Sequence, residues 1–167
     1  FPTIFNVLGP LTNPAGADRQ LIGVYRPELV EKVAQALARL GARRAMVVHG
    51  SDGLDEITTT GSTLIAHVEH GASGPSVRTE TLHPESLGLG LAKPADLIAS
   101  DLDHAVRIAR DVLEGKAGPA SDIVALNAAA ALVIGGAADS IADGLALAKH
   151  TLASGARSEE RRVGKEC

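Results

Sequence analysis

Aromatic residues are nearly absent from this 167-residue sequence: they make up 2% of it, with no tryptophan, one tyrosine and two phenylalanines. A core must therefore be built from aliphatic side chains, and stacking platforms for single-stranded nucleic acid are almost lacking. The single cysteine, Cys167, excludes an internal disulfide and is typical of a reducing compartment. Because no apolar run reaches roughly eighteen residues, we expect no segment to cross a membrane.

An excess of basic residues is missing as well. The sequence has 16 lysines and arginines against 20 aspartates and glutamates, a net charge of −4. Proteins that bind nucleic acid usually carry a basic surface, so the charge counts against that class. Hydrophobic residues at 45% and charged residues at 22% are ordinary for a globular chain and exclude general disorder. We expect a folded chain of the cytoplasm that begins within a longer protein.

The first part of the sequence predicts a strand–helix–strand unit. Residues 21–25 and 45–48 are short apolar runs typical of buried strands. Between them, apolar residues recur at helical spacing from Pro27 to Gly41. Pro27 suits the first turn of a helix, and Gly41 suits its end. A unit of this size favours two parallel strands joined by a right-handed crossover.

The rest of the sequence predicts a hairpin and then helices. Residues 63–68 and 77–82 alternate in polarity across a turn-forming cluster, which indicates an antiparallel pair. Residues 84–94 are expected to be a loop. Helices are expected over 101–113, over 123–134 with a cap at Ser121 or Asp122, and from a weak capping box at Ser140 and Asp143 to Ser154.

Three carboxylates follow the strand expected at 45–48, because Asp52, Asp55 and Glu56 lie in a loop that contains two glycines. Ligands of open α/β sheets bind beyond the carboxyl ends of strands. Carboxylate oxygens suit Mg²⁺, which takes one or two of them together with waters and substrate phosphates. Since neighbouring side chains diverge on a strand or helix, Asp55 and Glu56 could share a metal only in a loop. His49 is the histidine placed for a supporting role. The residues alone leave open that these acids merely face water.

A second unusual stretch, residues 6–14, is rich in proline, glycine and asparagine. Such a rigid loop can form the wall of a small-molecule pocket or a simple corner. The residues favour neither interpretation.

Three stretches resemble the anthranilate phosphoribosyltransferase family, in the same order along the chain. They are TIFNVLGPLTNPA at 3–15, VVHGSDGLDE at 47–56 and DIVALNAAAAL at 122–132. The resemblance implies an α/β fold, namely the larger α/β domain of the nucleoside phosphorylase/phosphoribosyltransferase type, with a central, mostly parallel sheet flanked by helices and the N-terminal helical domain missing. Residues 1–157 are then a partial α/β domain. Residues 158–167, which lack an apolar face, are expected to be a non-native or disordered tail; a solvated native tail is the alternative.

The resemblance also implies an activity. Such an enzyme of tryptophan biosynthesis moves phosphoribosyl from phosphoribosyl pyrophosphate to anthranilate, giving N-(5-phosphoribosyl)anthranilate and pyrophosphate, with Mg²⁺ as cofactor. By matching motif positions, Asp55 and Glu56 are the metal-linked pair, and Gly9 and Pro10 lie at the substrate; no residue is assigned as a catalytic acid or base. The family forms homodimers mainly through the missing domain, and this segment alone is expected to be inactive. Neither nucleic acid nor membrane is expected as a partner.

Two alternatives stay open. One is a pyrimidine nucleoside phosphorylase-like enzyme, which shares the fold and a related ribosyl chemistry. The other is a non-catalytic, nucleic-acid-binding relative of the same fold, which the net charge of −4 disfavours.

Overall fold

The computed structural model describes residues 9, 11–12, 16–72 and 74–154. They belong to two compact units, the sheet unit Phe1–Gly88 and the helical unit Leu89–Cys167. The elements of the sheet unit are β1 Arg19–Gly23, α2 Glu28–Arg39, β2 Arg44–Gly50, β3 Thr63–Gly71, β4 Gly74–Leu82 and the 3₁₀ helix η1 Pro84–Leu87. Those of the helical unit are the 3₁₀ helix η2 Pro94–Leu97, α3 Leu102–Leu113, α4 Pro119–Gly135 and α5 Ile141–Ser154. None of these helices is long and apolar enough to cross a membrane, within the residues just given.

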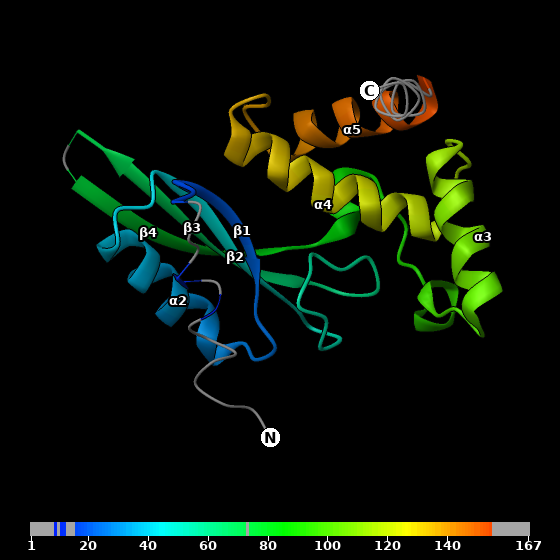
Figure 1. Ribbon diagram of the computed structural model, residues 1–167, viewed down its shortest axis with the longest axis horizontal. Coiled ribbons are helices and arrows are strands. Elements are labelled where there is room, and N and C mark those ends of the chain that lie inside the picture. The colour runs from blue at the N-terminus through cyan, green and yellow to red at the C-terminus, as the bar shows by residue number, and fades with distance from the viewer. Residues whose placement is uncertain (1–8, 10, 13–15, 73, 155–167) are drawn as a thin grey trace, which may run out of the picture. The chain divides into compact units, whose positions relative to one another are not determined.

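The four strands form one mixed sheet in the order β1-β2-β3-β4. β1 and β2 run parallel and α2 connects them, which confirms the predicted strand–helix–strand unit and the α/β class (Figure 1). β3 and β4 form the predicted antiparallel hairpin. The expectation of a mostly parallel sheet is wrong for the described strands, because β2 and β3 are also antiparallel. Their connection, residues 51–62, contains no helix, and a parallel return needs a longer crossover.

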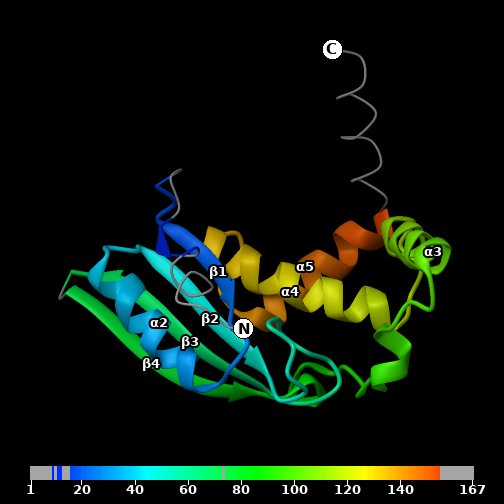
Figure 2. The ribbon, with the colours of Figure 1, turned by 60° about the horizontal axis from the view of Figure 1, so that its bottom comes forward.

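Helix α2 covers one face of the sheet, as two views of the ribbon show (Figures 1 and 2). Its residues Val30, Val33 and Leu37 are at most 3% exposed and recur at helical spacing. They belong to one cluster with the strand residues Val47 and Val68, which are fully buried. The core of this unit is therefore aliphatic, as the composition predicts.

The predicted helix 123–134 begins earlier than expected, at Pro119. Gly118 precedes it with φ at 155°, a conformation that glycine tolerates, and Pro119 loses no hydrogen bond at the first helical position. The expected cap at Ser121 or Asp122 is wrong, because Gly118 is the N-cap residue and no side chain caps this helix. The Ser121 hydroxyl donates to the Lys116 carbonyl instead. The expected loop at 84–94 is also partly wrong, because it begins with η1 and ends where η2 starts.

Helices α4 and α5 pack at very close range. A Cβ atom at Gly144 would lie 2.7 Å from the Ala129 carbonyl oxygen, so only glycine fits there without a shift. The predicted cap of α5 forms: the Asp143 amide donates to Ser140 Oγ at 3.1 Å, and that hydroxyl donates to the Asp143 carboxylate at 2.6 Å. This differs from a full capping box, in which the carboxylate would accept from the Ser140 backbone.

Candidate functional site

The loop that follows β2, residues 51–62, is closed by backbone hydrogen bonds, and we call it the acidic loop. The Gly50 amide donates to the Leu54 carbonyl at 2.8 Å, and the Ser51 amide donates to the Ser62 carbonyl at 2.8 Å. Gly53 lies in the turn between Gly50 and Leu54, and its φ of 93° favours glycine. The acidic loop is thus an irregular but internally bonded segment, as a shared carboxylate site requires.

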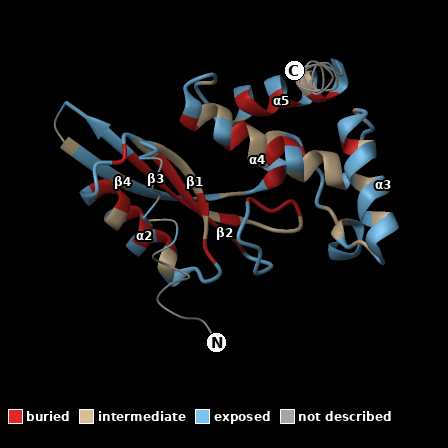
Figure 3. Ribbon diagram, viewed as in Figure 1, coloured by how far each residue is buried: buried red, intermediate tan, exposed pale blue. Residues whose placement is uncertain are grey.

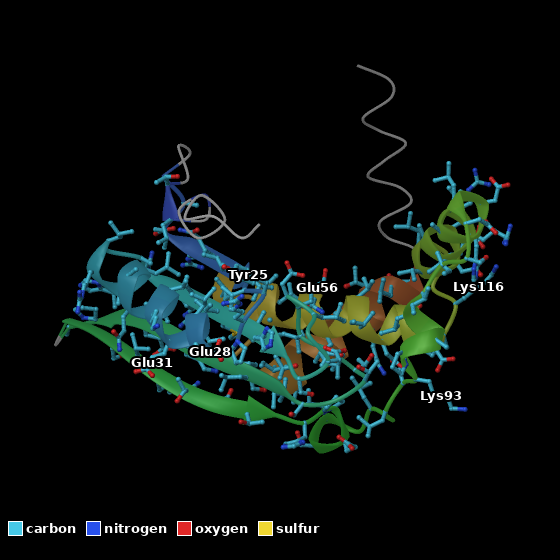
Figure 4. The ribbon with its side chains drawn as sticks, turned by 90° about the horizontal axis from the view of Figure 1, so that it is seen from below. Tyr25, Glu28, Glu31, Glu56, Lys93 and Lys116 are labelled. Atoms are coloured by element: carbon cyan, nitrogen blue, oxygen red, sulfur yellow. The ribbon has the colours of Figure 1, made fainter. Side chains whose placement is uncertain are left out.

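The end of β1 lies directly against this loop. A Cβ atom at Gly23 would overlap the backbone carbonyl oxygen of Asp55, so the absence of a side chain at Gly23 permits the contact. The Val24 amide donates to the Val48 carbonyl at 3.0 Å and continues the pairing past the strand end. The acidic loop therefore lies at the carboxyl ends of the two parallel strands, where α/β sheets place ligands. Figure 4 labels Glu56 on the loop and Tyr25 on the segment after β1.

The structure separates the three carboxylates that the sequence groups together. Asp52 accepts hydrogen bonds through both carboxylate oxygens: Oδ1 from the Leu54 amide at 3.1 Å, and Oδ2 from the hydroxyl of Thr58 at 2.6 Å and from that of Thr60. Asp55 and Glu56 are exposed. Neither of their side chains makes a hydrogen bond or ion pair within the described part of the chain. Only this last pair is free to bind a ligand.

The environment of Asp52 favours its ionised form. Partial burial raises the pKa of this carboxyl, but the hydrogen bonds from the two threonine hydroxyls and the Leu54 amide outweigh burial, so the pKa lies below its ordinary value. Asp52 is therefore a carboxylate with its acceptor capacity largely used inside the loop.

Residues 57–59, at the start of the second half of the loop, are buried, in contrast to its first half. Ile57, Thr58 and Thr59 are at most 1% exposed. The Thr58 amide donates to Thr63 Oγ1 at 3.0 Å, which ties this half to the start of β3. The Thr59 hydroxyl is the one fully buried side-chain oxygen or nitrogen without a hydrogen-bond partner among the residues that the structure describes.

His49, expected to support the acidic loop, is buried at the end of β2 with 8% of its surface exposed. Its Nδ1 lies 2.7 Å from the Val24 carbonyl oxygen. Since a carbonyl only accepts, Nδ1 carries the proton of this hydrogen bond. The structure thus gives His49 a part in joining β2 to the segment after β1, and its role toward a ligand stays a prediction.

Of the two residues predicted at the substrate, only Gly9 is among those described. It is exposed, and its carbonyl accepts from the Thr12 amide at 3.3 Å. No hydrogen bond of Gly9 to the acidic loop occurs in the described chain. Pro10 lies outside the described residues, as does the predicted tail at 158–167. The assignment of Gly9 and Pro10 to a substrate therefore stays a prediction.

The donor set of the acidic loop fits a magnesium ion that is shared with a ligand. No three histidines, cysteines, aspartates or glutamates gather into a complete metal site within the described ranges. Two exposed carboxylates on neighbouring loop residues, Asp55 and Glu56, are what remains. Mg²⁺ commonly binds one or two carboxylates and completes its octahedron with water and substrate phosphates.

The fold and this loop define a class. Residues 1–157 match the family described as "Glycosyl transferase family, a/b domain", and the chain belongs to that family. Within it, the chain is 54% identical over 154 residues to the anthranilate phosphoribosyltransferase of Moorella thermoacetica, which covers 92% of this chain and 44% of the relative. The enzyme of the same name from Syntrophotalea carbinolica is 51% identical over 150 residues, covering 90% and 42%.

Solved structures give the same result. The crystal structure of anthranilate phosphoribosyltransferase from Thermus thermophilus matches with a TM-score of 0.79 at 41% identity, over 93% of this chain and 44% of that one. The Saccharomyces cerevisiae enzyme in complex with PRPP and Mg matches with a TM-score of 0.76 at 28% identity, over the same shares of 93% and 44%. The chain thus spans under half the length of the relatives that it matches.

The sequence reasoning missed the threonines that surround Asp52. Their signal is present in the run of three threonines at 58–60, six to eight residues after the carboxylate. A run of hydroxyl groups after an acidic turn could have indicated the hydrogen bonds, because threonine hydroxyls and carboxylates pair readily in loops.

Proposed function

We propose that the complete protein containing this chain is an anthranilate phosphoribosyltransferase, which moves phosphoribosyl from phosphoribosyl pyrophosphate to the amine of anthranilate. The identity of 54% to an enzyme of that name supports the reaction. The structural observation that carries the proposal is the pair of exposed carboxylates, Asp55 and Glu56, on a loop at the carboxyl ends of β1 and β2. A phosphorylated ligand with its metal suits that place.

In this reaction Asp55 and Glu56 would bind and orient the magnesium ion, and neither acts as a nucleophile. Mg²⁺, when bound, supplies positive charge that offsets the charge of the departing diphosphate. The carboxylates would hold the ion or its waters at the open end of the sheet, where they are free of competing partners in the described chain. The amine of anthranilate is itself the nucleophile and needs correct placement, so we assign no catalytic acid or base.

The wider setting is part of the same proposal. We place the protein in tryptophan biosynthesis in the cytoplasm, as a homodimer formed mainly through a helical domain outside this segment. Residues 1–157 are proposed as part of its α/β domain, with Gly9 and Pro10 near the substrate and no nucleic acid or membrane partner. The family match over 1–157 supports the domain assignment, and the net charge of −4 counts against a nucleic-acid partner.

The decisive experiment measures turnover of the complete protein at limiting Mg²⁺. Asp55→Ala and Glu56→Ala should each lower turnover by about a hundredfold or more, since removal of an outer-sphere partner alone typically costs metal sites 10–100-fold. Glu69→Ala is a matched control, because Glu69 is an exposed acid of β3 outside the loop. Unchanged turnover in both loop variants would remove the metal assignment.

A substrate panel separates the alternatives. Phosphorolysis of a pyrimidine nucleoside without any transfer to anthranilate would favour the phosphorylase-like enzyme. A salt-dependent mobility shift with DNA, together with no transfer, would favour a nucleic-acid-binding relative.

A further inference from the structure

We propose that Asp52, with the hydroxyl groups of Thr58 and Thr60, is a positioning residue that fixes the acidic loop and so sets where Asp55 and Glu56 present their carboxylates to a magnesium–diphosphate ligand. The proposal rests on the proposed function, which it deepens at the same site. It concerns a residue that touches neither metal nor substrate and acts through its neighbours.

The first step is the way that Asp52 bridges the loop. Its Oδ1 accepts from the Leu54 amide at 3.1 Å, and its Oδ2 accepts from Thr58 Oγ1 at 2.6 Å and from Thr60 Oγ1. These partners lie on both sides of Asp55 and Glu56 in the sequence. One carboxylate therefore fixes the chain immediately before and shortly after the two exposed acids.

The hydroxyl groups are themselves held in place. Thr58 Oγ1 accepts from the Thr60 amide at 3.0 Å and lies 3.1 Å from Thr60 Oγ1. The Thr58 backbone is fixed by Thr63 Oγ1 at the start of β3, and Thr58 is fully buried. Thr58, which binds Asp52, is therefore itself fixed to the sheet. Through Thr58, β3 determines where the Asp52 carboxylate lies, and Asp52 in turn fixes the exposed half of the loop.

Two glycines make room for this arrangement. A Cβ atom at Gly50 would lie 2.5 Å from Asp52 Oδ1 and 3.1 Å from Thr58 Cγ2, so the carboxylate can occupy that space only beside glycine. A Cβ atom at Gly23 would overlap the Asp55 carbonyl oxygen, so β1 supports the same stretch from the other side. The backbone of Asp55 is thus held between the end of β1 and the Asp52 hydrogen bonds.

These contacts also separate Asp52 from the metal-binding role. The Leu54 amide and the hydroxyl groups of Thr58 and Thr60 donate three hydrogen bonds to its oxygens. These bonds stabilise the carboxylate form and so lower the pKa of Asp52. Asp55 and Glu56 carry no such side-chain partners in the described chain. The three neighbouring acids therefore have two different functions.

The test uses the complete protein with four substitutions: Asp52→Ala, Thr60→Val, Thr60→Ser and, as a control, Thr81→Val. Thr81 is an exposed threonine of β4, away from the loop. Calorimetry measures the affinity for Mg²⁺ with PRPP, kinetics measures the KM for anthranilate, and hydrogen exchange measures the protection of the Leu54 amide. Thr60→Ser keeps the hydroxyl that Thr60→Val removes, so this pair isolates the hydrogen bond.

We expect Asp52→Ala to weaken Mg²⁺–PRPP binding by about tenfold or more and to abolish protection of the Leu54 amide. Thr60→Val should weaken binding about threefold, and Thr60→Ser should restore it. The KM for anthranilate should change by less than about twofold, because the loop positions the diphosphate end only. Thr81→Val should match the wild type in every measurement.

If Asp52→Ala fails to fold, the Thr60→Val and Thr60→Ser pair carries the test. Wild-type affinity and wild-type protection in Thr60→Val would overturn the positioning role, as would lost protection with unchanged affinity in Asp52→Ala. A wild-type protein that neither binds Mg²⁺–PRPP nor forms product would contradict the proposed function instead, while hydrogen exchange would still show whether Asp52 holds the loop.

Discussion

The sheet unit and the helical unit bury their apolar residues to different extents. In Figure 3 the strands β2 and β3 are largely buried, whereas α3 is largely exposed. Only Val112 of α3 is buried, although its apolar residues share one side. Among the residues that the structure describes, the exposed large hydrophobic residues of the helical unit are Leu91, Ile98, Leu102, Val106, Leu113, Val124 and Leu147. Those of the sheet unit are Tyr25, Leu40 and Leu54.

The difference shows that the helix packed on the sheet buries its apolar side chains more completely than the helices of the helical unit do. Helix α2 inserts its apolar stripe between alternating strand residues, and the cluster of Val30, Leu37, Val47 and Val68 excludes water. The acidic loop connects two strands of this well-packed unit, so its anchor residue Thr58 is supported by a rigid core. In the helical unit the buried apolar residues lie mainly on α4 and α5, for example Leu126 and Leu145, beside the close contact of Gly144.

The largest expected effect is in the sheet core. Leu37→Ala should lower the free energy of unfolding of the sheet unit by about 2–5 kcal/mol, because Leu37 is 1% exposed and its removal leaves a cavity. Leu102→Ala, at a residue 78% exposed, should change stability by less than about 0.5 kcal/mol. Hydrogen exchange, read on peptides from β2 and from α3, measures each unit separately. Equal losses at the two leucines would break the contrast between the units.

The next effect concerns the close contact of α4 and α5. Gly144→Ala should destabilise the helical unit by about 1–3 kcal/mol, since the new methyl group would lie 2.7 Å from the Ala129 carbonyl oxygen. Gly135→Ala is the matched control, because nothing lies within 4 Å of its Cβ position and alanine favours the helix. Exchange rates of α5 amides measure both. A Gly144→Ala protein as stable as the control would show that this contact yields easily.

A smaller effect is expected at the start of α5. Ser140→Ala should cost about 1 kcal/mol, because it removes the acceptor of the Asp143 amide hydrogen bond at 3.1 Å. Ser140→Asp should keep most of the stability, since aspartate caps helices about as well as serine. Urea denaturation of these two variants measures how much the capping hydrogen bond contributes to the stability of the helical unit. Equal losses in both would point to packing of Ser140 rather than capping.

Local sequence patterns predict the elements and pairings of this structure that depend on neighbouring residues, and not those that depend on distant contacts. The parallel pair β1–β2 and the hairpin β3–β4 follow from local periodicity, and both predictions are confirmed. The antiparallel pairing of β2 with β3 was not predicted. It depends on the path of the acidic loop, in which the hydroxyl groups of Thr58 and Thr60 donate hydrogen bonds to the Asp52 carboxylate. Periodicity carries no information about such bonds.

The same limit applies to the site. The sequence places Asp52, Asp55 and Glu56 in one loop and cannot say which carboxylate the threonine hydroxyls select. The structure shows that the hydroxyl groups bind Asp52 and that the side chains of the other two have no hydrogen-bond partner among the described residues. Likewise, the apolar spacing of α3 predicts a helix with an apolar side, but burial of that side depends on what packs against it.

The last expected effect is a pH dependence in the sheet unit. His67 Nε2 donates to Glu80 Oε1 at 2.7 Å between β3 and β4, and a carboxylate partner requires the proton on Nε2. Burial lowers the pKa of His67 below 6.5 and outweighs the hydrogen bond to Glu80, which alone would raise it. The folded protein therefore keeps His67 neutral at a pH where the unfolded chain already binds a proton.

Stability of the sheet unit should then fall as the pH drops below about 6.5, by at most about 1.4 kcal/mol per pH unit, until the folded-state pKa of His67 is passed. The pKa of Glu80 is also lowered: burial raises it, but the hydrogen bond from His67 and the charge of Arg78 outweigh burial, so stability falls further below about 4.5. His67→Gln keeps a donor toward Glu80 and removes the titration. Urea denaturation of both proteins at pH 7.5 and about 5.5 measures the difference. An equal loss in wild type and His67→Gln would show that another group of the sheet unit senses the acid, whereas a flat profile in His67→Gln alone assigns the effect to this buried imidazole.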